Sequence, residues 1–223
     1  HHQPGLIRGA PEKGALKLDA GAWSGQSRAM LRALIIFVPV VLRMLRRPMA
    51  WLRWFALRAG LLMLALVAIY AFINPPTTWT IVSAARDHTI APRQWVRLDD
   101  IAPVMRRSVV AAEDANFCLH WGFDMNEIRK VVASGSARGA STITQQTAKN
   151  VFLWQGRSWP RKALETAFTP MIEALWSKGR VLEVYLNLAE FGPGIFGVRA
   201  AAREYFATTP EALTPVQAAR LAA

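Results

Sequence analysis

A carboxylate pair in the middle of the chain has surroundings that suit chemistry. Glu113 and Asp114 follow an apolar helical pattern and precede Phe117 and His120 in a stretch that ends at Gly122. A carboxylate at the margin of an apolar helix is partly desolvated, which raises its affinity for a proton and suits general-base work near neutral pH. The same residues could instead form a solvated helix end, so by themselves they favour catalysis only weakly.

A second polar stretch covers residues 139–150. Small residues lead into it, and Thr142 with Gln145 three positions later forms a capping box, which predicts the start of a helix. The first turn of a helix has free backbone N–H groups that can bind a phosphate or a sugar. Four polar side chains, one of them a cation, then share one side of the predicted helix: Gln145, Gln146, Lys149 and Asn150. A well-capped surface helix explains the cap but not the length of this polar stripe.

Two further blocks follow. Arg161 and Glu165 are one helical turn apart, and as an exposed pair they would contribute only about 0.3–0.5 kcal/mol. Beside a catalytic carboxylate such a pair could do more. The fourth block, residues 178–198, contains Gly192, Pro193 and Gly194, which predict a tight loop between helices. Most of this block is interpreted as scaffold.

Helices must position these groups. The apolar spacing predicts a helix through Val104 to Glu113, capped by Asp99 or Asp100. Residues 158–178 form an amphipathic pattern in which Pro170 predicts a kink or a break. A second capping box, Thr214 with Gln217, predicts a helix near the end of the chain. No region alternates enough for a large sheet, so the fold class is mainly α.

The apolar content is concentrated near the N-terminus. Hydrophobic residues make up 52% of the chain and the mean hydropathy is +0.17, which is apolar for a soluble protein. Residues 54–73 reach the length of about 20 residues that a membrane-spanning helix needs. Arginines crowd the N-terminal side of this run, so the positive-inside rule places the N-terminus in the cytoplasm and everything after residue 75 outside. A buried core helix or an uncleaved signal segment is the alternative.

These patterns predict four regions. Residues 1–53 are a basic N-terminal segment without an assigned function, in which the apolar run 33–42 is too short to span a membrane. Residues 54–74 are the transmembrane anchor, 75–94 a short extended linker, and 95–223 the domain that carries the four blocks. The chain ends inside a helix-like run, so we expect the domain to continue past Ala223.

Charge and cysteine content narrow the function classes. The net charge is +12 with a pI near 11.0, which favours a polyanionic partner: a nucleic acid, an anionic membrane or a phosphate-bearing substrate. Much of the excess lies beside the apolar run, which disfavours a nucleic-acid groove. Cys118 is the single cysteine and the four histidines are scattered, so neither a disulfide nor a metal site is predicted.

In this order, the four blocks resemble glycosyltransferase family 51, the peptidoglycan polymerases of class A penicillin-binding proteins and of monofunctional biosynthetic transglycosylases. The resemblance covers roughly Trp95 to Phe206, and residues 152–159 are similar to the monofunctional branch. Because the 223 residues leave no room for a following transpeptidase domain, we expect the monofunctional branch. The resemblance implies a lysozyme-like, bilobal glycosyltransferase domain preceded by one transmembrane helix.

The resemblance also implies a reaction. The family joins lipid II units by an inverting displacement that forms a β-1,4 linkage, in which a sugar 4-hydroxyl attacks the anomeric carbon of the growing strand and expels undecaprenyl pyrophosphate. Glu113 would accept the hydroxyl proton. Asp114, Phe117 and His120 would shape its pocket.

Other positions inherit binding roles from the family. Lys149 and Arg161 match the cations beside the leaving pyrophosphate. Glu165 matches a second essential glutamate, which would hold those cations or assist the leaving group. The residues that would line the donor site are Thr142, Gln145, Gln146 and Asn150. No cofactor is certain; a divalent cation, Mg or Mn, stimulates some family members, but no ligand cluster in this sequence establishes one.

The implied partners are lipid II, the growing glycan strand, the bacterial inner membrane and other cell-wall synthesis proteins, with no nucleic acid. The N-terminus would be cytoplasmic and the catalytic domain periplasmic. Two alternatives stay open. A lytic transglycosylase or lysozyme-like hydrolase also uses a catalytic glutamate but needs no cationic phosphate site. A non-catalytic, membrane-anchored scaffold for cell-wall enzymes would not need Glu113, Lys149, Arg161 and Glu165 together.

Overall fold

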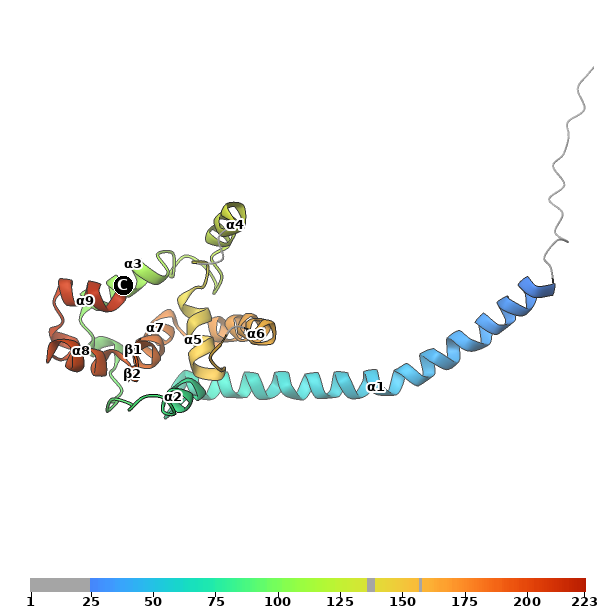
Figure 1. Ribbon diagram of the computed structural model, residues 1–223, viewed down its shortest axis with the longest axis horizontal. Helices are drawn as coiled ribbons and strands as arrows, with labels where there is room; N and C mark the ends of the chain where they lie inside the picture. Colours follow the sequence, from blue (N-terminus) through green and yellow to red (C-terminus); the bar gives the residue numbers. More distant parts are fainter. Residues whose placement is uncertain (1–24, 136–138, 157) are drawn as a thin grey trace, which may run out of the picture. The chain divides into compact units, whose positions relative to one another are not determined.

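A computed structural model describes residues 25–135, 139–156 and 158–223 of the 223-residue chain. The chain divides into two compact units, His1–Leu57 and Arg58–Ala223. Helix α1 (Gly25–Phe72) contains the described part of the first unit and continues into the second (Figure 1). The apolar run 33–42, predicted as a separate segment, is therefore part of α1.

Within α1, residues Pro48–Phe72 are long and apolar enough to cross a membrane, with a mean hydropathy of 2.1 over the most apolar window. This stretch contains most of the anchor predicted at residues 54–74. The domain boundaries drawn from the sequence stay predictions. Helix α1 passes through the boundary between residues 53 and 54 without interruption.

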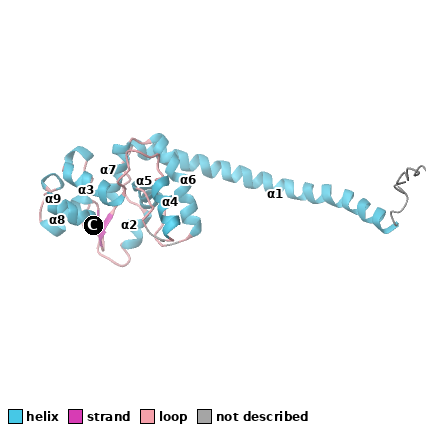
Figure 2. Cartoon of the chain, turned by 90° about the horizontal axis from the view of Figure 1, so that it is seen from above, coloured by secondary structure: helices cyan, strands magenta, loops and turns pink. Residues whose placement is uncertain are grey.

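The second unit is mainly α, as predicted, and Figure 2 shows helices and loops with one small pair of strands. Its helices are α2 (Trp79–Ala84), α3 (Pro103–Glu113), α4 (Met125–Ser134), α5 (Ile143–Phe152), α6 (Trp159–Leu175), α7 (Lys178–Leu188), α8 (Val198–Phe206) and α9 (Pro215–Ala222), with 3-10 turns η1 (Leu98–Asp100) and η2 (Pro210–Ala212). Strands β1 (Glu190–Gly192) and β2 (Ile195–Phe196) form an antiparallel hairpin at the tight loop predicted from the glycines.

Helix α5 is the central helix of this unit, because it packs against both α6 and α7. Its buried apolar residues Ile143, Ala148 and Val151 belong to the same core cluster as Phe168 of α6 and Val184 of α7. The predicted capping box starts the helix: the Thr142 hydroxyl accepts from Gln145 N, and the Gln145 side chain accepts from Thr142 N. The apolar face of α5 is thereby packed in the core that it shares with two neighbouring helices.

Helix α3 packs against α9 and ends at Glu113. Met105 and Val109 are buried, in agreement with the predicted apolar face of α3. The second predicted capping box, Thr214 with Gln217, starts α9. The start of α9 and the buried face of α3 therefore follow from local sequence signals.

Two local predictions are wrong, and of the kink or break predicted at Pro170 the break does not occur. The linker is not fully extended, because Thr78 caps α2 through a hydrogen bond from Ile81 N. Asp99 and Asp100 lie in η1, and α3 starts after Ala102 with a proline at its first position. Pro170 does not break α6, which continues from residue 159 to residue 175. One lost backbone hydrogen bond is tolerated there, because the helix is buried on both sides of the proline.

Candidate active site

Glu113 lies at the C-terminal end of α3 with its side chain exposed. Gln146 Nε2 on α5 donates a 2.7 Å hydrogen bond to Glu113 Oε2. The Tyr185 hydroxyl on α7 donates to Gln146 Oε1 at 3.4 Å. The expectation that an apolar surrounding desolvates Glu113 is therefore wrong: the carboxylate faces solvent and is oriented by an amide instead of being enclosed.

Two hollows meet at Glu113. The larger has a volume of about 590 Å³ and the smaller about 180 Å³. Polar residues that line the larger hollow beside Glu113 are Tyr185, Glu190, Tyr205 and Arg220. Polar residues that line the smaller one are Asp114, Asn116, Asp124, Glu127, Ser141 and Thr142. The carboxylate is thus accessible from two sides, as a group that reacts with a large substrate must be.

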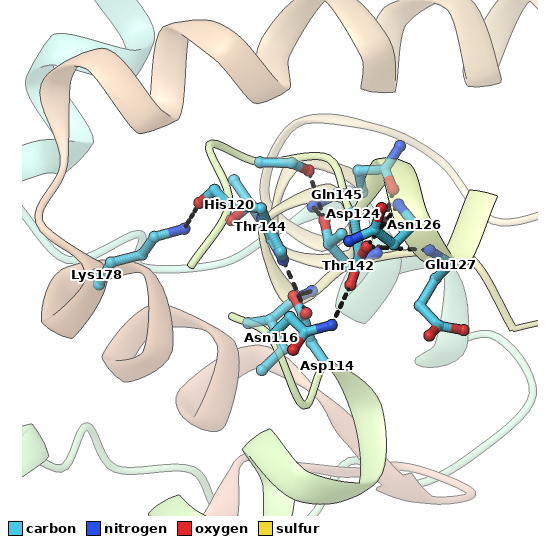
Figure 3. A network of polar contacts seen from close by, with 12 residues as sticks. Asp114, Asn116, His120, Asp124, Asn126, Glu127, Thr142, Thr144, Gln145 and Lys178 are labelled. Atoms are coloured by element: carbon cyan, nitrogen blue, oxygen red, sulfur yellow. Dashed lines mark hydrogen bonds and ion pairs between the residues drawn. The ribbon is translucent and has the colours of Figure 1, made fainter. Parts of the chain in front are cut away.

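Asp114 connects the first motif to the second. Its Oδ2 accepts from Ile143 N at the start of α5, and its Oδ1 lies 2.8 Å from His120 Nε2. Asp114 and His120 are both drawn in the network of Figure 3. Asp114 is largely buried, so these two contacts satisfy a side chain that has little access to water. This contact sets the end of α3 beside the start of α5 and brings Glu113 to Gln146.

Gly122 closes the loop between these motifs. The Thr142 hydroxyl donates to Gly122 O at 2.7 Å. Gly122 has φ +82°, and a Cβ there would lie 2.5 Å from Thr169 Cγ2. A side chain at this position would therefore meet both backbone strain and a clash.

Asp124 is the N-cap of α4 and accepts hydrogen bonds from Asn126 N, Glu127 N and Asn116 Nδ2. The side-chain hydrogen bond from Asn116 is the main cause that holds the pKa of Asp124 below its ordinary value, followed by the backbone bond from Glu127. Asp124 is therefore an ionised structural acceptor within the network of Figure 3.

Asp114, His120 and Asp124 have potential ligand atoms within 4.8 Å of one another. Their hydrogen bonds argue against a metal centre. Both carboxylates already accept from backbone N–H groups, and His120 Nδ1 is buried without a partner among the described residues. A metal on His120 Nε2 would place the ring proton on Nδ1, where this part of the chain offers no acceptor. The groups that could ligate a metal ion already have hydrogen-bond partners, and the divalent cation stays a prediction.

A cationic group surrounds Glu165. Arg161 Nη1 pairs with Glu165 Oε1, and Lys162 Nζ lies 3.0 Å from Glu165 Oε2. The Arg161 and Glu165 side chains are only 12% and 5% exposed. The predicted pair exists, but the expectation that it is exposed is wrong. Because this pair is buried, loss of one partner would leave the other charge uncompensated, which is strongly destabilising.

Lys149 lies one turn beyond Gln146 on α5 and is half-buried. Burial is the main cause that lowers its pKa, whereas the charges of Glu165 and Glu113 act in the opposite direction. Its ammonium is therefore within electrostatic reach of both glutamates. Lys149 therefore interacts electrostatically with Glu113 and with the charged group around Glu165.

Other predicted site residues have structural surroundings. Phe117 is buried, with Lys178 Nζ 4.5 Å from its ring centroid, and the same ammonium donates to His120 O at 2.9 Å. Thr142, Gln145 and Asn150 are also buried. The side chains of Thr142 and Gln145 form the hydrogen bonds of the helix cap. Thr142 in addition lines the smaller hollow. Whether these residues touch a substrate stays a prediction.

Two residues of this arrangement were missed by the reasoning from sequence. Lys162 is three positions before Glu165, a helical spacing that would have found it. Tyr185 was interpreted as scaffold, and no local signal links it to Gln146, 39 positions earlier. Burial, followed by the charge of Glu113, raises the pKa of Tyr185, so its hydroxyl stays a donor.

The chain is similar to known proteins. A family model described as Transglycosylase matches residues 81–223. A biosynthetic peptidoglycan transglycosylase of Jannaschia sp. (strain CCS1) is 57% identical over 164 residues, which cover 74% of this chain and 69% of that protein. Proteins of the same name from Caulobacter vibrioides and Pseudomonas entomophila are 48% and 45% identical over 161 and 190 residues, covering 70% and 81% of this chain and 70% and 79% of theirs.

Proposed function

Because the chain belongs to the Transglycosylase family and is a peptidoglycan glycosyltransferase that polymerises glycan strands, we propose that Glu113 is the base of its reaction. The 4-hydroxyl of one lipid-linked disaccharide attacks the anomeric carbon of the growing strand. A C–O bond forms there as the C–O bond to undecaprenyl pyrophosphate breaks, with inversion, and Glu113 accepts the hydroxyl proton. The product is a β-1,4 linkage.

The spacing of groups along α5 is the observation that carries this proposal. Gln146 holds the Glu113 carboxylate, and Lys149 lies three residues further along the same helix. Three residues of helix correspond to a rise of about 4.5 Å. An in-line displacement needs a base on one side of the attacked carbon and charge stabilisation for the leaving group on the other. One turn of α5 offers both.

The leaving pyrophosphate is an anion, and three cations lie near the buried Glu165: Lys149, Arg161 and Lys162. One glutamate cannot neutralise all three. Arg161 can hold phosphate oxygens with its planar fork, while the two lysines act as point charges. Glu165 orients Arg161 and Lys162, so the cations are in place before the charge on the leaving oxygen develops.

The proposed location follows from the substrate. A polyprenyl-linked sugar lies in a membrane, and residues Pro48–Phe72 can cross one. Arg46, Arg47 and Arg53 precede or begin this stretch, so the positive-inside rule places the N-terminus in the cytoplasm. The domain then faces the outer side of the inner membrane. Lipid II, the growing strand and the inner membrane are the proposed partners.

The experiment that tests this function is a product analysis. The full chain, purified in detergent, is incubated with labelled lipid II, and we expect a polymer that lysozyme digests. A parallel sample receives mature peptidoglycan. Release of anhydro-sugar fragments from that sample, without polymer from lipid II, would contradict the proposal and favour a lytic enzyme.

A further inference from the structure

We propose that Arg180 on α7 is a positioning residue that couples the end of α1 to the catalytic domain and sets the domain's height above the membrane. This inference rests on the proposed function, because it takes α1 to be a membrane anchor. It assigns a role to the fourth sequence block, which the proposed mechanism leaves as scaffold.

The last turns of α1 pack as part of the domain. Met63, Val67, Tyr70 and Ala71 follow helical spacing on one face, with Val67 fully buried and the other three packed against the core. The Tyr70 ring lies 5.8 Å from the ring of Phe152, measured between centroids. This face of α1 is therefore covered by protein and cannot face lipid.

Two polar side chains hold the backbone of the same turns. Trp176 Nε1 donates to Val67 O at 2.8 Å. Arg180 Nη2 donates to Tyr70 O at 2.9 Å and to Ile73 O at 3.0 Å, and Arg180 Nη1 donates to Asn74 Oδ1 at 2.8 Å. The last four carbonyls of a helix have no partner within it, and a cation is favourable at this end. Since α1 has no basic residue in its own last turn, Arg180 supplies the missing charge from another helix.

Arg180 is itself held in position. Its Nη1 lies 2.8 Å from Glu183 Oε1, and its guanidinium lies 5.4 Å from the centroid of the Trp95 ring. Glu183 also accepts from Trp95 Nε1 and Leu98 N. The Arg180 side chain is only 14% exposed, so little water competes for these bonds. The contact is a preorganised clamp with donors aimed at α1.

The clamp and the active site share a helix. Arg180 and Tyr185 are five residues apart on α7, and Tyr185 donates to the Gln146 that holds Glu113. The 25-residue apolar stretch of α1 is about 37 Å long at 1.5 Å per residue. The hydrocarbon core is about 30 Å thick, so the stretch exceeds it by more than one turn. Because Arg180 binds the last turn of this stretch, it would fix the distance between Glu113 and the membrane surface, and so the distance between Glu113 and a substrate whose tail is in the bilayer.

The test compares two substrates with the full chain in lipid vesicles. One is lipid II with its long polyprenyl tail in the bilayer, and the other is a short-chain, water-soluble analogue. We expect Arg180→Gln to lower the rate on the embedded substrate at least about tenfold and the rate on the soluble one less than about twofold, because only the former depends on the height of the site. The matched control is Arg203→Gln, which removes an exposed arginine paired with Glu204 and should change neither rate.

A second readout does not depend on activity. Hydrogen exchange of amides 71–74 should accelerate in Arg180→Gln and in Asn74→Ala, which removes the side-chain acceptor. If both act through one contact, the double variant should be no worse than Arg180→Gln alone. Should Arg180→Gln fail to fold, Asn74→Ala carries the test.

Equal losses on both substrates, or unchanged exchange at residues 71–74, would overturn the clamp. A wild-type chain that polymerises neither substrate would instead refute the proposed function. The exchange measurement would then still decide whether Arg180 holds the end of α1.

Discussion

The amide nitrogen of Gln146 lies 2.7 Å from a carboxylate oxygen of Glu113, so a residue of α5 orients the acid at the end of α3. We expect Gln146→Ala to lower kcat by about tenfold or more, because a base that swings freely is less often aligned with the hydroxyl it must deprotonate. Steady-state kinetics with lipid II measure this effect.

Tyr185→Phe is the companion to this variant. It removes the hydroxyl that orients the Gln146 amide but keeps the ring, so its effect should have the same direction and be smaller. An effect on KM alone in both variants would mean that Gln146 binds substrate and does not orient the base.

The rate of the reaction should fall at a lower pH than the titration of an ordinary lysine would predict. Burial lowers the pKa of Lys149 from 10.5, so its ammonium is lost as pH rises through that lowered value, and with it part of the pyrophosphate site. A profile of kcat/KM against pH measures the alkaline limb. In Lys149→Arg this limb should move to higher pH, because a guanidinium keeps its charge above pH 12. An unchanged limb in that variant would exclude Lys149 as its source.

Stability should change with pH in the opposite sense to activity. Between the lowered pKa and 10.5, the unfolded chain binds more protons at Lys149 than the folded chain does. The contribution of this lysine to the free energy of unfolding therefore increases as pH rises through this window. Denaturant unfolding of wild type and Lys149→Met across that range should show the difference, and a parallel pH dependence in the two would count against burial as the cause.

The Arg161–Glu165 pair separates stability from activity. Glu165→Leu leaves Arg161 buried without its counter-charge, which should cost roughly 3–5 kcal/mol of the free energy of unfolding. Adding Arg161→Met should restore most of that loss, because a buried ion pair and an apolar pair are similarly stable. Denaturant unfolding measures the recovery.

Activity should not recover in the double variant, since the pyrophosphate site has lost its arginine. The two measurements together decide the role of the pair. A double variant that is stable and active would mean that the pair is only structural.

Local signals predicted the parts of the site that neighbouring residues determine. Capping boxes at Thr142 and Thr214 start α5 and α9 where expected, and the spacing of Arg161 and Glu165 predicted their contact. Each depends on residues three or four positions apart, which helix geometry brings together without help from the rest of the fold.

Contacts between distant residues could not be predicted in this way. Gln146 meets Glu113 across 33 positions, and Arg180 meets Tyr70 across 110. The exposure of Glu113 also depends on how α3 and α5 pack. The apolar residues of α3 alone led to the wrong prediction that Glu113 has an apolar surrounding. Family resemblance supplied candidates for the site, but only packing brings Tyr185 into it.

The most direct test of the central claim is the single-turnover rate of lipid II coupling in Glu113→Gln. Glutamine keeps the size of the side chain and its hydrogen bonding but cannot accept a proton as a base. The control is Glu127→Gln, which changes another carboxylate beside the smaller hollow. We expect a loss of about 100-fold or more in Glu113→Gln, with unchanged helical content by circular dichroism, and less than about threefold in the control. A Glu113→Gln variant that couples lipid II at the wild-type rate would contradict the assignment of Glu113 as the base.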